Sequence, residues 1–209
     1  EEKYPNIPYF LLGHSMGSFL LRQYLGLYGD GISGAIVMGT GSKSNLLLTA
    51  GKVLCRIIAF GKGWEYRSKL VNNMAFGGFN KKFSQETNGS DWLSRNPVNS
   101  QKYAKDPLCS FVFTVNAYYQ MFCGILAVNH QEKNGKIPKT LPIFLVAGKD
   151  DPVGNFGKSV ENIYKNYKSC GIEDVSMKLY ENDRHEILNE VDRSLVFDDL
   201  LTWMEKRKR

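Results

Sequence analysis

The sequence predicts an α/β fold with a mostly parallel sheet and helices on both of its faces. Short, mostly apolar runs occur at residues 9–12, 34–38, 143–147 and 175–180, and we expect each to form a strand. Continuous runs such as "YFLL" and "IFLVA" are typical of strands buried on both faces of a parallel sheet. Apolar residues at helical spacing follow the first run, as a crossover between two parallel strands requires.

The first predicted strand leads directly into "LLGHSMGS", residues 11–18, where Ser15 is the centre of a G-x-S-x-G pattern. Apolar residues then recur at helical spacing through residues 19–28. A serine on a sharp turn between a strand and a helix forms a nucleophile elbow, and the following helix directs its positive end at the site. The alternative is a tight turn with an incidental serine.

A serine nucleophile needs a general base, because its neutral hydroxyl is a weak nucleophile. The chain has three histidines, His14, His130 and His185. His185 follows the predicted strand at 175–180, so it lies at the carboxyl end of the sheet, where open α/β sheets build their sites. A histidine in a loop is often only solvated, so the prediction of His185 as the base depends on its position.

A carboxylate at another strand end is expected to orient the histidine and to stabilise its charged form. Two candidates, Asp150 and Asp151, follow the apolar strand at 143–147 in the segment "GKDDPVG". The order serine, aspartate, histidine along the chain is the order found in the α/β-hydrolase fold.

The chain resembles the branch of the α/β-hydrolases that contains the monoacylglycerol lipases, the bacterial lysophospholipases and the serine aminopeptidases of the prolyl type. The motifs that carry the resemblance are "GHSMGS", "GAIVMGTG", "GKDDPVG" and "YENDRHEILNE". The resemblance implies Ser15 as nucleophile and His185 as general base and then acid. It also implies Asp151 as the orienting acid, with Asp150 as the competing choice, and the backbone N–H of Met16 as an oxyanion donor.

Members of that family have several strands and a helix before the nucleophile strand, and a His-Gly loop among them supplies a second oxyanion donor. This chain begins at the nucleophile strand. We therefore expect the N-terminal part of the hydrolase core to lie outside this sequence, which leaves the first strand as an unprotected edge. Because loss of one oxyanion donor lowers turnover by roughly 100- to 1000-fold, the activity of these residues alone is in doubt.

About 100 residues separate the second predicted strand from the third, far more than a single crossover helix needs. The family resemblance implies that a helical cap occupies this place. We predict hydrolase core at residues 1–41 and 140–209 and the cap at 42–139. Between the cap helices, the turn-rich segment at residues 77–97 is expected to be an ordered loop with Trp92 as its anchor.

Two cap segments, residues 45–60 and 110–128, are apolar over more than one helical face. They either line an acyl-binding pocket or pack only against each other. In the first case we expect Met121 and Phe122 to contact the substrate, together with His14 beside the nucleophile.

The composition is that of an ordinary globular protein, with 209 residues of which 43% are hydrophobic and 23% charged. The net charge is +6, but the densest basic run, "EKRKR", ends a predicted last helix with apolar residues at Leu195, Leu200, Leu201 and Met204. Basic residues there favour the helix dipole and stay solvated, so we expect no nucleic-acid partner. No run reaches the roughly 18 apolar residues of a membrane span, so any contact with a lipid surface is expected to be transient.

The four cysteines, Cys55, Cys109, Cys123 and Cys170, are scattered and form no C-x-x-C pair. They are expected to be reduced, which favours a cytoplasmic location. Neither the cysteines nor the histidines have zinc-site spacing, and the glycine runs lack the lysine of a phosphate loop. We therefore expect no metal and no cofactor, and the sequence does not predict an oligomeric state.

The first functional hypothesis is a capped serine hydrolase that cleaves carboxylic esters, such as monoacylglycerol or lysophospholipid, through an acyl-enzyme. The alternative is a serine aminopeptidase of the same fold. An aminopeptidase needs an acidic pocket for a free amino group, and the cap offers Glu65, Glu86, Asp91 and Asp106. A third hypothesis is a non-catalytic, hydrolase-like protein that binds lipid, because a fold does not guarantee activity.

Overall fold

The structure is a computed structural model and describes residues 7–83, 89–133 and 135–208. In this part of the chain, four strands form one sheet in the order β1-β2-β3-β4. The strands are β1 (Phe10–His14), β2 (Gly34–Met38), β3 (Ile143–Gly148) and β4 (Val175–Tyr180). The helices are α1 (Met16–Tyr28), α2 (Asn45–Lys62), α3 (Lys69–Phe76), α4 (Pro97–Lys105), α5 (Val115–Lys133), α6 (Lys158–Ser169) and α7 (Arg193–Glu205). Three 3-10 turns are η1 (Lys81–Phe83), η2 (Asp91–Leu93) and η3 (Ile187–Asn189).

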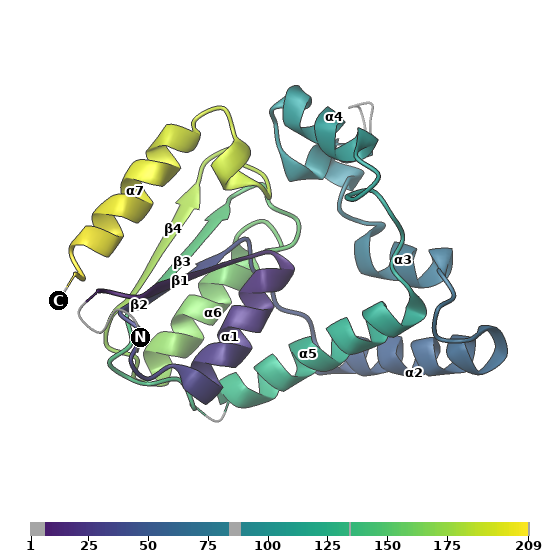
Figure 1. Cartoon of the computed structure of the whole chain (residues 1–209), viewed down its shortest axis with the longest axis horizontal. Helices are drawn as coiled ribbons and strands as arrows, with labels where there is room; N and C mark the ends of the chain where they lie inside the picture. The colour runs from purple at the N-terminus through teal and green to yellow at the C-terminus, as the bar shows by residue number, and fades with distance from the viewer. Residues whose placement is uncertain (1–6, 84–88, 134, 209) are drawn as a thin grey trace.

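All neighbouring strands of the sheet are parallel. Ala35 of β2 lies opposite Ile143 of β3, which in turn lies opposite Val175 of β4. Helix α1 connects β1 to β2, and α6 connects β3 to β4 (Figure 1). The predicted parallel α/β fold is confirmed, and the carboxyl ends of all four strands meet at one edge of the sheet.

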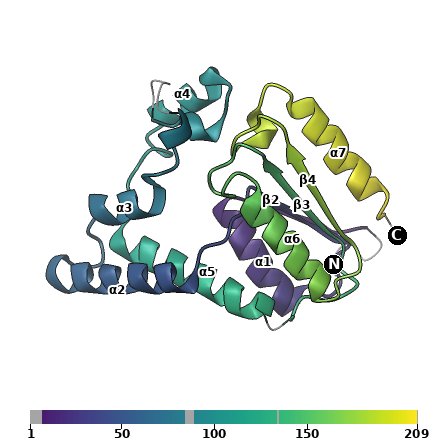
Figure 2. The same ribbon diagram turned by 180° about the vertical axis from the view of Figure 1, so that it is seen from behind.

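Helices cover both faces of the sheet (Figures 1 and 2). On one face, Leu25 of α1 and Ile163 of α6 share an apolar cluster with Val37 and Leu145 of the central strands. Helix α7 covers the other face. The two central strands are therefore buried along their whole length.

The last helix, α7, packs on the sheet through one face only. Leu195 and Leu201, two of the apolar residues noted in its sequence, are 49% and 51% exposed. Val196, Leu200 and Trp203 are buried instead. Residues three and four positions apart share one helical face, and Leu195 and Leu201 lie on either side of that face.

The first strand is less buried than its apolar sequence predicted. In the described residues, β1 is an edge strand that pairs with β2. Leu12 is 47% exposed, and Gly13 is the one buried residue of the strand. Burial on both faces is found at β2 and β3, because these strands have a neighbour on each side and helices above and below.

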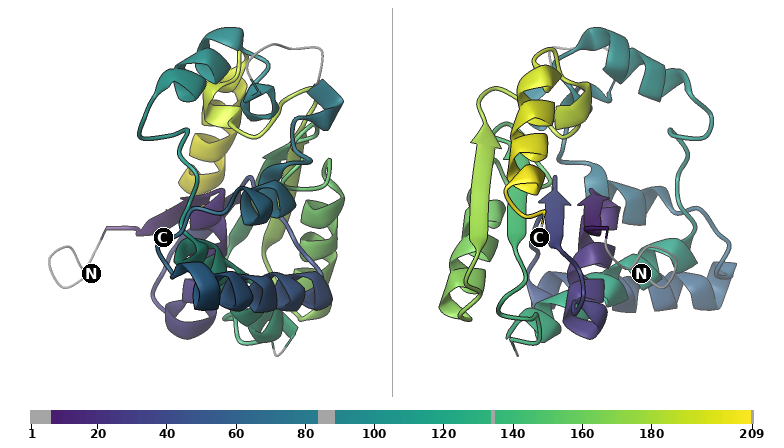
Figure 3. Two further views of the ribbon diagram at one scale, coloured as in Figure 1. Left: turned by 90° about the vertical axis from the view of Figure 1, so that its right-hand side faces the viewer. Right: turned by 60° about the vertical axis from the view of Figure 1, so that its left-hand side comes forward.

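Helices α2 to α5 lie between β2 and β3 in the chain and extend beyond the sheet (Figure 3). Helices α2 and α5 pack against each other through an apolar cluster that includes Leu48, Cys55, Phe122 and Ile125. The two short helices α3 and α4 were not predicted. The division of the chain into a core and a cap stays a prediction.

Helix α5 begins at Val115 and not at residue 110. The hydroxyl of Thr114 accepts a backbone hydrogen bond from the first turn, as an N-cap does. The N–H of Val115 donates to the carbonyl oxygen of Tyr66 at 2.8 Å, so a segment before α3 satisfies one free donor of the first turn. Apolar residues at 111–113 therefore belong to the approach to the helix.

Candidate active site

Ser15 occupies a sharp turn between β1 and α1. Its backbone has φ 55° and ψ −121°, a conformation that non-glycine residues rarely adopt. Hydrogen bonds hold the turn on both sides, because the N–H of Ser15 donates to Met38 O at 3.1 Å and the N–H of Ser18 donates to Ser15 O at 2.9 Å. A strained residue held in this way is typical of a functional site.

The two glycines of the motif have different roles. A Cβ atom on Gly13 would lie 2.4 Å from the carbonyl oxygen of Gly17 and 2.8 Å from Cβ of Leu21, so a side chain there would collide with α1. A Cβ atom on Gly17 would have no neighbour within 4 Å outside its own helical turn. Close packing of the strand against the helix therefore requires glycine at position 13 only.

The structure brings Ser15, His185 and Asp151 into one hydrogen-bonded chain. The Oγ of Ser15 lies 2.8 Å from Nε2 of His185, and Nδ1 of His185 lies 2.9 Å from Oδ2 of Asp151. His185 is 2% exposed and Asp151 is 0% exposed. A neutral imidazole that donates from Nδ1 to a carboxylate has a free lone pair on Nε2 to accept the serine proton.

Asp151 and Asp150 differ in what they contact. The second carboxylate oxygen of Asp151 accepts the N–H of Val153 at 2.8 Å, which fixes the direction of the carboxylate. Asp150 instead faces the ammonium group of Lys82 at 2.5 Å and is partly exposed. Of the two candidates, Asp151 is the one placed to orient His185.

His14 is not among the residues that line the cavity beside Ser15, although we expected it to contact the substrate. Its Nε2 donates to the backbone carbonyl oxygen of His185 at 3.1 Å, and the two rings lie 4.7 Å apart. Burial, and then the proximity of His185, lowers the pKa of His14 and so favours its neutral form. Gly39 makes this approach possible, since a Cβ there would lie 3.1 Å from the His14 ring.

A cavity of about 740 Å³ opens beside Ser15. Met121 and Phe122 of α5 line it, and so does Met16. Contact of Met121 and Phe122 with a substrate stays a prediction. Phe122 also belongs to the apolar cluster between α2 and α5, so the helices pack against each other and line the cavity at the same time. Aromatic side chains contribute to the remaining wall, among them Phe19, Phe76, Phe79, Trp92 and Phe113.

Trp92 contacts the candidate base directly. Its ring lies 5.1 Å from the ring of His185 and 5.0 Å from that of Phe79. Trp92, which we expected to anchor the turn-rich loop, therefore lies next to the site.

The backbone N–H of Met16 is available as a hydrogen-bond donor to a ligand. Met16 is the first residue of α1, and the first N–H groups of a helix have no acceptor within the helix. The positive end of the helix dipole lies at the same place, which favours a developing negative charge beside Ser15.

Of the acidic residues considered for an aminopeptidase, those that the structure describes do not line the cavity. Asp91 is buried outside the cavity and accepts a hydrogen bond from the amide of Asn80 at 3.1 Å. Asp106 and Glu65 are exposed, and among the described residues neither lines the cavity wall. Glu86 lies outside the described residues.

Sequence reasoning missed a buried ion pair that supports the loop after β2. Arg22 donates to Gly41 O at 2.8 Å and to Thr40 Oγ1 at 2.9 Å, while its other nitrogens pair with Glu132 at 2.8 Å. The hydroxyl of Tyr167 donates to the same carboxylate at 2.5 Å. The available signal was an arginine within the apolar stretch "FLLRQYL".

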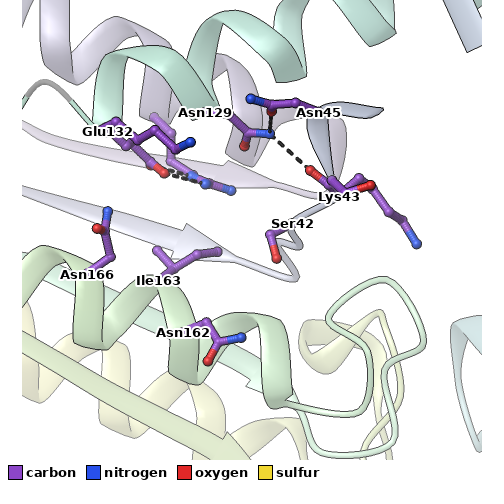
Figure 4. A pocket seen from close by; sticks show the side chains of 11 residues that line it. Ser42, Lys43, Asn45, Asn129, Glu132, Asn162, Ile163 and Asn166 are labelled. Carbon is purple, nitrogen blue, oxygen red and sulfur yellow. Dashed lines mark hydrogen bonds and ion pairs between the residues drawn. The ribbon is translucent and has the colours of Figure 1, made fainter. Parts of the chain in front are cut away.

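A second cavity, of about 390 Å³ and lined mostly by residues with polar or charged side chains, lies next to this ion pair (Figure 4). Asn129 of α5 is one of the lining residues, and its amide donates to Lys43 O at 3.0 Å and to Asn45 Oδ1 at 2.8 Å. These contacts tie α5 to the residues that lead into α2.

Other kinds of site are absent from the part of the chain that the structure describes. No group of three His, Cys, Asp or Glu side chains there is arranged to hold a metal ion. No described helix combines the length and the apolar character needed to cross a membrane. The four cysteines are free thiols.

Comparison with known families gives one match that covers most of the sequence. The family described as "Serine aminopeptidase, S33" matches residues 1–192. Two curated relatives are a monoacylglycerol lipase of Mycolicibacterium smegmatis, 24% identical, and a monoglyceride lipase of Mus musculus, 28% identical. They match 96% and 99% of this chain, which spans 63% and 61% of their own lengths.

Solved structures share the architecture. A thermostable carboxyl esterase from Bacillus coagulans, in complex with glycerol, superimposes with a TM-score of 0.88 at 26% identity, over 100% of this chain and 67% of that one. A monoglyceride lipase from Saccharomyces cerevisiae, in complex with a substrate analogue, has a TM-score of 0.71 at 20% identity, over 98% of this chain and 64% of that one.

Proposed function

The chain belongs to the serine aminopeptidase, S33 family, and we propose that it carries the catalytic residues of a serine hydrolase for carboxylic esters. Its substrates in this proposal are esters with one acyl chain, such as monoacylglycerol or lysophospholipid. The observation that carries the proposal is the hydrogen-bonded chain from Ser15 through His185 to Asp151, at 2.8 and 2.9 Å, beside an apolar cavity.

In the proposed mechanism, Oγ of Ser15 attacks the ester carbonyl carbon while Nε2 of His185 takes the hydroxyl proton. Asp151 stabilises the imidazolium that forms, and the N–H of Met16 donates to the oxyanion. His185 then returns the proton to the departing alcohol, which leaves an acyl group on Ser15. A water molecule, deprotonated by His185, releases the acid and restores the serine.

The lining of the cavity favours an acyl chain over a peptide. Its wall is mostly apolar, and of the described residues that line it, Lys43 is the charged one. A free amino group would need a carboxylate partner, because an unpaired charge is costly to bury. The relatives that are named as lipases agree with an ester substrate.

An exposed apolar stripe on α2 supports transient contact with a lipid surface. Leu46, Ile57 and Phe60 are 83%, 64% and 97% exposed, and basic residues of the same helix lie beside them. Such a surface suits shallow insertion among anionic lipids. Co-sedimentation with phosphatidylglycerol vesicles, compared between the wild type and Phe60→Ser, tests this contact.

The experiment that tests the function is intact-mass analysis after treatment with a fluorophosphonate. We expect one adduct in the wild type, none in Ser15→Ala, and slow labelling in His185→Ala and Asp151→Asn. Loss of the orienting carboxylate is expected to slow the reaction by about 10⁴-fold. The matched control is Asp150→Asn, which changes the neighbouring carboxylate and should label like the wild type. An adduct that persists in Ser15→Ala, or a wild type that never labels, would contradict the proposal.

A further inference from the structure

The loop that carries His185 is held by Trp92 and Leu93, which lie in the long segment between β2 and β3. The N–H of Glu186 donates to the carbonyl oxygen of Leu93 at 2.7 Å, and the N–H of His185 donates to that of Trp92 at 3.4 Å. The Trp92 ring also lies against the imidazole. The position of the candidate base therefore depends on the placement of residues 91–95.

Glu190 joins the same two segments through a fully buried carboxylate. Its Oε1 accepts the backbone N–H groups of Arg184 and Arg95, both at 3.0 Å. Its Oε2 accepts the hydroxyl of Ser94 at 3.0 Å. A buried carboxylate is tolerated only with donors around it, so Glu190 is stable there only while both segments are in place.

The guanidinium group of Arg95 faces three carboxyl groups. Its Nη2 lies 2.9 Å from Asp183 and 2.6 Å from Asp192, and its Nε lies 3.7 Å from Glu190. The neighbouring Arg184 is directed elsewhere, to the carbonyl oxygen of Asp91 at 2.6 Å. We call Arg95, Asp183, Glu190 and Asp192 the Arg95 clamp.

The Arg95 clamp contains three carboxyl groups and one guanidinium group. Burial raises the pKa of Asp183 to about 7, with Asp192 and Glu190 as further causes, while Arg95 acts in the opposite direction. Asp183 Oδ2 and Asp192 Oδ1 are buried, and neither oxygen accepts a hydrogen bond from a donor group of the described residues. A hydrogen bond between these two carboxyl groups requires a proton on one of them, which would reduce the excess negative charge.

The clamp also contacts the loop that carries the orienting acid. The carbonyl oxygen of Asp183 accepts the N–H of Asp150 at 2.9 Å, one residue before Asp151. The end of β3 packs closely against this loop, since a Cβ on Gly148 would lie 2.2 Å from the same carbonyl oxygen. A displacement of Asp183 would therefore displace both Asp151 and His185.

We propose that Arg95 is a positioning residue, which acts through Asp183 and Glu190 to hold the His185 and Asp151 loops in line with Ser15. The effect on catalysis rests on the proposed ester hydrolysis, whereas the effect on the geometry of His185 does not. Arg95 itself does not touch the reacting atoms in this proposal.

The test compares Arg95→Gln with the matched control Arg207→Gln. Arg207 makes a similar two-armed pair with Asp174, at 2.7 and 2.8 Å, but next to the start of β4 and so at the opposite end of the sheet from Ser15. Small displacements of reacting groups are costly, so we expect Arg95→Gln to lower kcat for 4-nitrophenyl butyrate by roughly 10- to 100-fold. KM should change by less than about threefold, because the Arg95 side chain does not line the cavity.

Two further readouts separate positioning from a loss of folding. Arg95 is 28% exposed, so added guanidinium ion should reach the vacated space and restore part of kcat in Arg95→Gln. Histidine-selective NMR should show a distinct downfield Nδ1 proton for His185 in the wild type and in Arg207→Gln, and its loss in Arg95→Gln. If Arg95→Gln does not fold, Arg95→Lys keeps the charge, and its kcat and Nδ1 signal should both be reduced.

The outcomes distinguish the two proposals. A wild type that hydrolyses no ester, while Arg95→Gln still loses the Nδ1 signal, would overturn the proposed function and support the clamp. An Arg95→Gln protein that keeps both its kcat and its Nδ1 signal would overturn the clamp. So would a loss of kcat that is matched by Arg207→Gln.

Discussion

Two ionic clusters flank the Ser15 site, one buried and one partly exposed, and they differ in charge balance. In the first, Arg22 pairs with Glu132 through two nitrogens, both at 2.8 Å, so one positive charge meets one negative charge. In the Arg95 clamp, a single guanidinium group meets three carboxyl groups. The first cluster supports the loop after β2, and the second supports the loop of His185.

The two clusters also differ in whether their charge changes with pH. Burial alone would lower the pKa of Arg22, but Glu132 raises it, so Arg22 stays charged at any ordinary pH. Asp183 in the clamp has a pKa raised to about 7, mainly by burial. The two sides of the site are therefore expected to respond differently to pH and to the loss of one partner.

The largest effect is expected from Arg22→Met. This substitution leaves Glu132 as a buried carboxylate without its cation, and the free energy of unfolding should fall by about 3–5 kcal/mol. Denaturation in urea measures the change. The double variant Arg22→Met/Glu132→Gln should recover part of the loss, because it removes the uncompensated charge. A single variant as stable as the double one would mean that the pair is not isolated from water.

A smaller effect, which depends on pH, is expected from Asp183→Asn. The native state holds a proton on Asp183 up to about pH 7, whereas the ordinary pKa is 3.8, so this group favours folding at low pH and the benefit is lost as the pH rises through about 7. The wild type should therefore lose on the order of 2 kcal/mol relative to Asp183→Asn between about pH 5 and pH 8. Subtracting the two urea titrations cancels groups that do not interact with Asp183, including His14, whose lowered pKa acts in the opposite direction. If the difference in free energy of unfolding between the two proteins does not change with pH, the two clusters do not differ in their response to protons.

The smallest effect is expected from Lys82→Gln. Lys82 pairs with Asp150, but the two side chains are 49% and 31% exposed, so water and salt screen the pair. The free energy of unfolding should change by less than about 0.5 kcal/mol. The same urea titration serves as the measurement. A change as large as that of Arg22→Met would show that exposure does not separate the strong pairs from the weak ones.

Features with a local sequence pattern were predicted well. The apolar runs at 34–38 and 175–180 have the bounds of β2 and β4. Ser15, Asp151 and His185 meet within hydrogen-bond distance, because each follows a strand and parallel strands end at one edge. Their catalytic roles stay predictions.

Features that depend on distant partners were not predicted. Arg22 and Glu132 are 110 residues apart in the chain, and no pattern in one marks the other. His14 was expected to face the substrate, but the nearest acceptor for its ring is a carbonyl oxygen 171 residues later. Arg95 was missed for the same reason, because its ion-pair partners lie about 90 residues later, between β4 and α7.

The insertion between β2 and β3 also affects how the chain reaches this structure. Ala35 must pair with Ile143, more than 100 residues later, whereas Phe10 pairs with Gly34 within one βαβ unit. Each doubling of a loop adds about 0.6 kcal/mol of closure entropy, so the central pairing of the sheet is expected to form last. Until then both inner strands have open edges, and this stage of folding is where the chain is most prone to aggregate.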